Sequence, residues 1–394
     1  MPYRPWTDTA LLPARDGLTR FAHQIMAEMP RADQRRWGET YIRGLLLGNG
    51  RRSVRSIAEG ADVPDAVQSL QQFVNQSPWD WAPVRRRTAR YVDEHMTTHA
   101  WLIRPIYIPK RGGQTAGVAR RYVPRTGRTL NCQYGLGLFL SDAETSAPVD
   151  WRLVLPSPAG TGARSWLPGR REVGPSEQSE WCHVLAMADD VAAAVPVRPL
   201  VVGLRHVTGV ERLLQGLRQR GLPFVVEVND SMPVLRQLAP SSLPGGARPG
   251  LTQIRSLVQE TTARRQPVMW RQLHDAALHR SYVTTVPVRL PGTVAGSGGG
   301  ADCLLVAVWS AAATSAANFW LTGLPESQVG HVLTLAQLAA RRERDVDTLS
   351  EGYGLLDFEG RSSRGWHHHM TLVSAAYAFA QLGTCSQQQE QRVG

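Results

Sequence analysis

The chain has 394 residues, of which 42% are hydrophobic and 20% are charged, and its 44 Lys and Arg outnumber its 33 Asp and Glu. This length allows a substantial core and more than one domain, and the composition is that of a soluble globular protein. No run of 18 apolar residues occurs, which excludes a transmembrane helix, and the N-terminal stretch lacks the apolar core of a signal peptide. We therefore expect a cytoplasmic protein with no membrane partner.

The positive charge is concentrated in the first third of the chain. Residues 1–130 carry 21 Lys and Arg against 11 Asp and Glu, whereas the other residues carry 23 against 22. A localised positive charge is typical of a protein that binds a polyanion, most often nucleic acid. An ordinary solvated basic surface is the alternative interpretation.

The region from residue 14 to residue 98 repeats apolar residues at helical spacing throughout, and we expect residues 1–98 to form a helical, basic, DNA-binding domain. Two short helices joined at Asp62-Val63-Pro64 are compatible with a helix-turn-helix, although many helix pairs that bind nothing have the same pattern. A further helix carries four arginines within six residues. They either contact phosphate or form a solvated face: Arg85, Arg86, Arg87 and Arg90.

Strand patterns begin at residue 100 with "AWLIRPIYI" and continue through "GVARRYVPRTGRTLNCQYGLGLFLSD" and "DWRLVLP", which we interpret as three strands in series. Alternating helices and strands follow, up to "PFVVEV". The order predicts a mixed α/β domain with a partly parallel sheet over residues 99–228 and 326–384. A β-rich insertion is expected over residues 229–325, and a disordered Gln-rich tail over residues 385–394.

Several clusters of chemically active side chains stand out, but none forms a recognised catalytic motif. His367, His368 and His369 are adjacent, and neighbouring residues of a helix point about 100° apart, so they cannot converge on one metal ion. The four cysteines are scattered and are interpreted as free thiols. The stretch "FEGRSSRG" places Glu359 near Arg361 and Arg364, either as an ion-pair cluster or as a cleft wall.

A predicted hairpin within residues 117–133 carries Arg120, Arg121, Arg125 and Arg128. This basic ribbon could grip a phosphate backbone, or its charges could protect a sheet edge against aggregation.

The segments "DQRRWGETYIRGLLL", "LQQFVNQSPWDWAPVRRR", "GVARRY", "TGRTLNCQ", "DWRLVLP", "RGLPFVVEV", "FWLTGLP" and "LLDFEGRSSRGWHHHMTLV" occur in collinear order over roughly residues 20–383. Together they resemble an insertion-sequence transposase of the DDE superfamily, in the IS seven-zero-one branch of the IS-four-like clan. The resemblance implies an RNase H-like domain with a β insertion, preceded by a helical DNA-binding region. It also implies two-metal phosphodiester chemistry, in which three carboxylates hold two Mg²⁺ ions.

All three of the carboxylate positions that the resemblance implies are substituted here. The first, after the apolar run "AWLI", is Arg104, and Pro105 follows it. The second, at the end of "LVVGL", is Leu204, and the third is Gly352, seven residues before the Glu of "FEGR". Because Arg104 would bring a permanent positive charge to the metal position, we expect the Mg²⁺ site and transposase activity to be lost and no cofactor to be bound.

Three functions remain open at this point. The first is a catalytically inactive, domesticated transposase-like protein that binds DNA and forms a homodimer. Its candidate DNA contacts are basic: Arg51, Arg52, Arg55, Arg85, Arg86, Arg87, Arg90, Lys110, Arg120, Arg121, Arg125 and Arg128. The second is an enzyme recruited to a small-molecule substrate. Its pocket would be lined by Arg104, His206, Glu359, Arg361, His367 and His368. The third, a minor alternative, is an active transposase.

Overall fold

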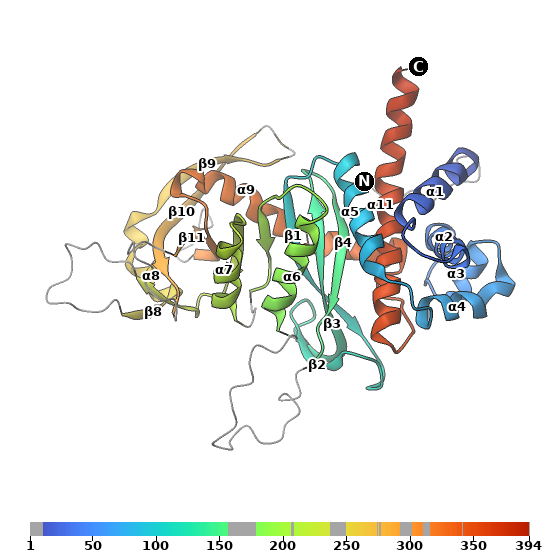
Figure 1. Cartoon of the computed structure of the whole chain (residues 1–394). Helices are drawn as coiled ribbons and strands as arrows, with labels where there is room; N and C mark the ends of the chain where they lie inside the picture. Colours follow the sequence, from blue (N-terminus) through green and yellow to red (C-terminus); the bar gives the residue numbers. More distant parts are fainter. Residues whose placement is uncertain are drawn as a thin grey trace.

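The computed structural model describes residues 11–156, 179–205, 209–236, 250–273, 275, 277–291, 302–309, 316–340 and 342–393. The molecule is elongated, with a group of helices at one end, a large sheet through the middle and a β-rich region at the other end (Figure 1). The helices of the C-terminal part run back along this arrangement, and the long last helix lies against the helical end.

The helical end consists of five helices in the order expected from the apolar spacing. They are α1 (Leu11–Ile25), α2 (Ala32–Leu47), α3 (Val54–Gly60), α4 (Val67–Asn75) and α5 (Trp81–His95), with a 3₁₀ turn at Pro64–Ala66. The helices α2 and α3 approach closely because position 44 is glycine: a Cβ there would lie 2.1 Å from the carbonyl oxygen of Ile57. The Asp80 side chain caps α5 by accepting a hydrogen bond from the Ala82 N–H at 2.9 Å.

The central part of the sheet has the mixed order that the resemblance implies. Its elements are β1 (Ala100–Pro109), β2 (Val118–Val123), β3 (Arg128–Ser141), β4 (Ser146–Leu153), α6 (Glu180–Ala192), β5 (Leu200–Val202), α7 (Val210–Gln219) and β6 (Phe224–Val228). β3 pairs antiparallel with β1, β2 and β4, whereas β5 runs parallel to both β1 and β6. The predicted mixed α/β, RNase H-like fold is confirmed.

The middle of the three predicted strands is a hairpin of two strands, β2 and β3, so four strands precede α6. The turn between them contains Gly127, which has a φ of +63° and occupies the left-handed region that favours glycine. The apolar pattern gave a single strand for this stretch, whereas the hairpin predicted within residues 117–133 agrees with the two strands.

The insertion contains β7 (Pro233–Arg236), β8 (Leu251–Gln253), α8 (Ile254–Glu260), a 3₁₀ turn at Thr262–Arg264, β9 (Gln266–Arg271), β10 (Leu278–Arg289), β11 (Cys303–Trp309) and β12 (Ala316–Thr322). β12 pairs antiparallel with β6, so the strands of the insertion continue the central sheet into one 12-stranded sheet. The described residues of the segment 229–325 are therefore rich in strands, and the β12–β6 ladder joins them to the α/β region.

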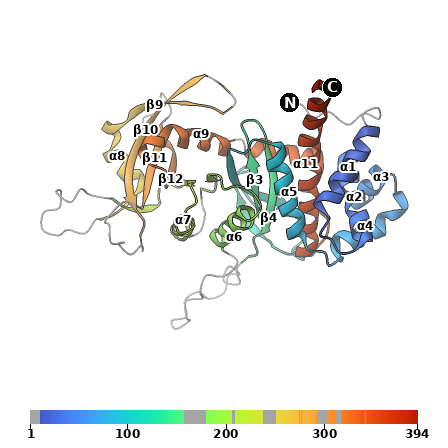
Figure 2. The same cartoon turned by 45° about the horizontal axis from the view of Figure 1, so that its top comes forward.

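The C-terminal part forms α9 (Val329–Ala340), α10 (Arg342–Tyr353) and α11 (Ser363–Val393), after a 3₁₀ turn at Glu326–Gln328. α9 extends from the insertion to the central strands, where it contacts β1, β5 and β6 (Figure 2). α11 contacts α2, α5 and β4, and so joins the helical end to the sheet. Within the described part of the chain, no helix has the length and apolar character needed to cross a membrane.

The backbone of α11 remains helical through Val393, so the disorder predicted for residues 385–394 is not found in residues 385–393. The segment is rich in Gln and contains Glu and Arg, which have high helix propensity, and it continues a helix that is already formed.

Candidate functional site

The proline that follows Arg104 is accommodated inside β1 because β5 is short. The Trp101 N–H donates to the Pro199 carbonyl at 3.0 Å, and the Ile103 carbonyl accepts from the Gly203 N–H at 3.4 Å, so these residues turn their backbone groups toward β5. Alternate residues of a strand face the same neighbour, and Pro105 therefore faces the side where β5 has already ended. Its missing N–H removes no hydrogen bond from the ladder with β3.

Arg104 is buried in the middle of β1, with only 2% of its surface exposed. Its Nη1 forms an ion pair with the Asp345 carboxylate on α10. Its Nη2 lies 3.3 Å from both the Ser146 hydroxyl on β4 and the Leu338 carbonyl on α9. The guanidinium also lies over the Phe139 ring, 4.8 Å from the ring centroid. One side chain thus joins two strands to two helices.

The positions of these partners favour the Arg104 charge. The Leu338 carbonyl on α9 accepts a hydrogen bond from the guanidinium, and the Asp345 carboxylate on α10 supplies the compensating negative charge. Arg104 therefore links β1 to both α9 and α10.

The other two positions implied by the resemblance have different surroundings. Leu204 follows β5, adjacent to Pro105 if the parallel register continues, and is 6% exposed. Gly352 lies seven residues after Asp345 on α10, which corresponds to about 10 Å along the helix axis. Its carbonyl accepts a hydrogen bond from Arg52 Nη2 at 3.1 Å. The α10 residue that meets β1 at Arg104 is therefore Asp345 and not Gly352.

The residues at this position do not fit a two-metal centre. Such a centre needs several carboxylate oxygens free to bind the ions, but Leu204 offers none and Asp345 is engaged by Arg104. In the described part of the chain, no group of three or more His, Cys, Asp or Glu side chains is arranged to hold a metal ion. The Arg104 guanidinium, which stays protonated, lies beside the carboxylate that remains.

The side chains predicted to line a small-molecule pocket have separate partners. Arg104 is engaged by Asp345, while Glu359 lies 3.1 Å from Arg51 in an exposed ion pair. Arg361 is exposed, and its carbonyl accepts from the Ala116 N–H at 2.9 Å. His206 lies outside the described residues. The ion pair recorded for Glu359 joins it to Arg51, and no ion pair to Arg361 or Arg364 is recorded in the described part of the chain.

The three histidines pack between the helical end and α11. The His367 ring stacks on Trp81 with centroids 4.6 Å apart, and its Nδ1 lies 3.1 Å from Arg85 Nη2. The His368 ring stacks on Trp79 at 3.8 Å. Burial, aided in each case by a neighbouring arginine, lowers the pKa of His367 well below its usual value and that of His368 to about 4. Both contact residues of the helical end, and neither has a recorded hydrogen bond to Arg104.

The third histidine, His369, connects α11 to the helical end. Its Nδ1 lies 3.0 Å from the Tyr41 hydroxyl, and its Nε2 lies 2.9 Å from the Gly354 carbonyl. A neutral ring satisfies both contacts, because Nε2–H can donate to the carbonyl while Nδ1 accepts from the hydroxyl. Burial lowers the pKa of His369 to about 4, which agrees with a neutral, structural role.

Two of the predicted DNA-binding arginines, Arg52 and Arg85, have side chains buried inside the protein, so neither presents an exposed guanidinium to DNA in this structure. Arg52 is 4% exposed and donates to the carbonyls of Leu45, Gly50 and Gly352. Arg85 is also 4% exposed and pairs with Asp150 at 2.8 Å. Their burial could not be predicted from the sequence, because a run of arginines predicts a solvated face and does not show which of its members points inward.

Most of the other predicted contacts are engaged on the surface. Ion pairs hold Arg51 to Asp357 and Glu359, Arg86 and Arg87 to Glu28, and Arg125 to Asp347. Three others donate to backbone carbonyls: Arg90 to Ala194, Lys110 to Phe358 and Arg121 to Val154. Burial and the nearby Arg51 charge also lower the pKa of Lys110.

Three predicted contacts remain exposed with no ion pair recorded in the described part of the chain: Arg55, Arg120 and Arg128. Arg55 lies on α3, the first helix of the expected helix-turn-helix. The same segment carries Glu59, Asp62 and Asp65, so it is not predominantly basic. Arg120 and Arg128 lie on the β2–β3 hairpin, together with the exposed Arg111 in the preceding loop. The hairpin is therefore the part of the predicted interface that the structure leaves available.

A comparison with protein-family models gives a match to DDE superfamily endonuclease over residues 24–292. The chain belongs to this family. A search of curated proteins gave no match. The match begins in α1 and ends just after β10, so it spans the Arg104 strand, β5 and the β2–β3 hairpin. In this DDE superfamily member, β1 carries the buried Arg104.

Sequence reasoning missed Asp345 and Ser146 as partners of Arg104. Asp345 is 241 residues away along the chain, and no local pattern relates the two. The one available signal was electrostatic: an arginine within an apolar strand requires a carboxylate partner.

Proposed function

We propose that this DDE superfamily member binds nucleic acid but does not cleave it. The observation that carries the proposal is the buried Arg104–Asp345 ion pair, at the position that the resemblance assigns to the first metal ligand of the family. Two-metal hydrolysis needs carboxylates that clamp cations against the scissile phosphate, and a guanidinium paired inside the protein cannot replace them. Family membership and the basic surface support a nucleic-acid partner.

The β2–β3 hairpin is the part of the surface best suited to this partner. β1 pairs with Cys132–Ser141 of β3, whereas residues 128–130 of β3 have β2 as their one neighbouring strand in the described part of the sheet. The outer part of the hairpin is therefore a two-stranded ribbon, a shape that enters the grooves of DNA. Exposed Arg120 and Arg128 lie on it, together with Tyr122, which is 61% exposed.

The surroundings of this ribbon contain few negative charges. No Asp or Glu occurs in the sequence between Glu94 and Asp142, a stretch with six arginines and one lysine. Asp347 of α10 pairs with Arg125 at the turn and leaves the flanking arginines uncompensated. This distribution should attract phosphates and give binding a strong dependence on salt concentration.

The experiment measures binding of the full chain to a fluorescent duplex by anisotropy across a salt series, with EDTA or with Mg²⁺. We expect binding that weakens with salt, persists in EDTA and so needs no Mg²⁺, and is accompanied by no cleavage when Mg²⁺ is added. Arg120→Gln with Arg128→Gln should reduce the slope of log K against log salt by about 2, because two phosphate contacts are removed.

A matched control removes two arginines that already have carboxylate partners. Arg31 pairs with Asp33, and Arg220 pairs with Asp189. Replacing both with Gln changes the net charge equally and should leave the slope within experimental error. Mg²⁺-dependent nicking of the duplex, or no binding at low salt, would contradict the proposal.

The finer family assignment is also a proposal. The collinear motifs, including "GWHHHM" in α11, support the IS seven-zero-one branch. With transposition lost, a member of this branch would be a domesticated protein.

We also propose a homodimer, by analogy with transposases that act on paired DNA ends. Sedimentation of the chain with and without duplex tests this oligomeric state.

A further inference from the structure

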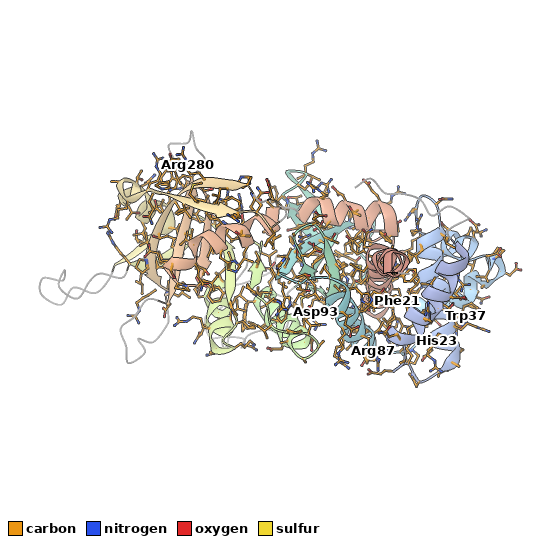
Figure 3. The ribbon with its side chains drawn as sticks, turned by 90° about the horizontal axis from the view of Figure 1, so that it is seen from above. Phe21, His23, Trp37, Arg87, Asp93 and Arg280 are labelled. Atoms are coloured by element: carbon orange, nitrogen blue, oxygen red, sulfur yellow. The ribbon has the colours of Figure 1, made fainter. Side chains whose placement is uncertain are left out.

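A second ribbon lies at the end of the molecule remote from the helical region. β9 pairs with Leu278–Val283 of β10, while β11 pairs with β10 only from Tyr282 onward. In the described part of the sheet, residues 278–281 of β10 therefore have β9 as their one neighbouring strand. Figure 3 shows Arg280 of this ribbon at the opposite end of the molecule from Arg87 of the helical region.

This ribbon is locally basic, although the chain after residue 130 is nearly neutral. Residues 261–290 contain five arginines and one acidic residue, Asp275. Four of these arginines are exposed, and no ion pair is recorded for them within the described residues: Arg264, Arg265, Arg271 and Arg280. By contrast, Arg236 and Arg255 of the same insertion pair with Glu260 and Asp230.

The pairing register places arginines and apolar side chains on one face. Arg271 lies opposite Leu278, and Met269 lies opposite Arg280, and opposed residues of an antiparallel pair point to the same side. Met269 is 53% exposed and Leu278 is 57% exposed. The alternate residues point the other way, and Trp270 among them is buried. We call the set Met269, Arg271, Leu278 and Arg280 the ribbon face.

Two arginines, Arg280 of the ribbon face and the nearby Arg265, lie over aromatic rings. Arg265 and Arg280 each lie 5.4 Å from the centroid of Tyr282, and Arg265 is also 5.5 Å from Trp309. Stacking limits the conformational freedom of a guanidinium while leaving its N–H groups available for hydrogen bonds. These side chains would therefore lose less entropy when they bind an anion.

We propose that the ribbon face is a second DNA contact, seated in the major groove, and that it works together with the β2–β3 hairpin. This inference rests on the proposed function. Adjacent strands lie about 4.8 Å apart, so a two-stranded ribbon with its side chains fits a major groove about 12 Å wide but not a minor groove about 6 Å wide. The arginines reach phosphates or guanine edges, and Met269 and Leu278 contact the apolar thymine methyl groups.

The test compares two double variants of the full chain in the same salt-series binding assay. Arg271→Gln with Arg280→Gln should reduce the salt slope by about 2 and weaken binding at least tenfold at low salt. Arg236→Gln with Arg255→Gln changes the net charge equally in the same insertion and should leave the slope unchanged. Met269→Ala with Leu278→Ala should weaken binding several-fold with no change in slope. Netropsin, which fills the minor groove, should not compete.

Each other outcome has a definite meaning. If the wild-type chain binds no duplex, the proposed function fails and this inference fails with it. If wild-type binding depends on Arg120 and Arg128 while the Arg271 and Arg280 variant matches its control, the second contact alone is overturned. It is also overturned if that variant keeps its slope but self-associates on size exclusion, since the arginines would then only protect the β9 edge. Competition by netropsin would overturn the major-groove placement.

Discussion

Replacing Arg104 with methionine should destabilise the whole molecule strongly. The substitution keeps a long side chain in β1 but leaves the Asp345 carboxylate, 12% exposed, without its cation. It also removes the donors that face the Ser146 hydroxyl and the Leu338 carbonyl. Breaking a buried pair in this way costs about 3–5 kcal/mol of unfolding free energy.

A second substitution separates loss of the ion pair from loss of packing. When Asp345→Leu is added to Arg104→Met, no buried charge remains, and an apolar pair in place of a buried ion pair is often neutral or stabilising. We expect the double variant to recover most of the lost stability. Arg125→Met is the control. Its partner Asp347 lies on α10, as Asp345 does, but this ion pair is exposed, so the loss of unfolding free energy should stay below about 1 kcal/mol.

The measurement is equilibrium urea unfolding, followed by tryptophan fluorescence, with the m-value compared among the variants. If Arg104→Met costs no more than Arg125→Met, the pair is not a buried structural link. If the double variant is as unstable as the single one, the loss comes from packing, and the electrostatic reasoning is refuted.

Three further predictions concern the junction between α11, the helical end and the sheet. The pKa of His369 is lowered to about 4, and the ring is neutral in the fold. Its contribution to the free energy of unfolding is therefore present above pH 6.5 and is lost as the pH falls from 6.5 toward 4. In urea unfolding, the wild type should lose about 2 kcal/mol more unfolding free energy than His369→Gln between pH 7 and pH 5. Gly354→Ala should lower the thermal midpoint by several degrees, because φ there is +68° and the new Cβ would lie 2.4 Å from Arg52 Cβ. Arg85→Met should destabilise the fold by less than Arg104→Met, because Asp150 keeps a second cation, Arg152, at 3.2 Å. It should leave the salt slope of DNA binding unchanged, and a reduced slope would restore Arg85 to the interface.

Much of the fold could be predicted from local patterns in the sequence. Apolar spacing found the helices of residues 14–98, and the alternation of strands and helices after residue 100 predicted the mixed sheet. The long helical stretch predicted after residue 325 is described as α9 and α10, on either side of residue 341, which lies outside the described residues. Arg104 contacts both helices.

The candidate site was less predictable because charge in a sequence does not show its partner. Arg85 and Arg87 are two residues apart on α5, yet the first is buried against Asp150 and the second lies on the surface against Glu28. The exposed arginines of the β9–β10 ribbon were missed for a related reason. In the net charge of residues 131–394, the acidic residues balance these arginines. In the structure, nearby acidic residues such as Glu260 and Asp230 pair with other arginines instead.

The Arg104–Asp345 pair also bears on how this protein could change in evolution. A single step back toward catalysis, Arg104→Asp, would place a second carboxylate against Asp345 in a buried site with no cation between them. Under the proposed function, such a variant would be less stable than the present chain, and Leu204 would still supply no ligand. The Arg104–Asp345 pair therefore makes any single substitution toward a metal site at this position costly.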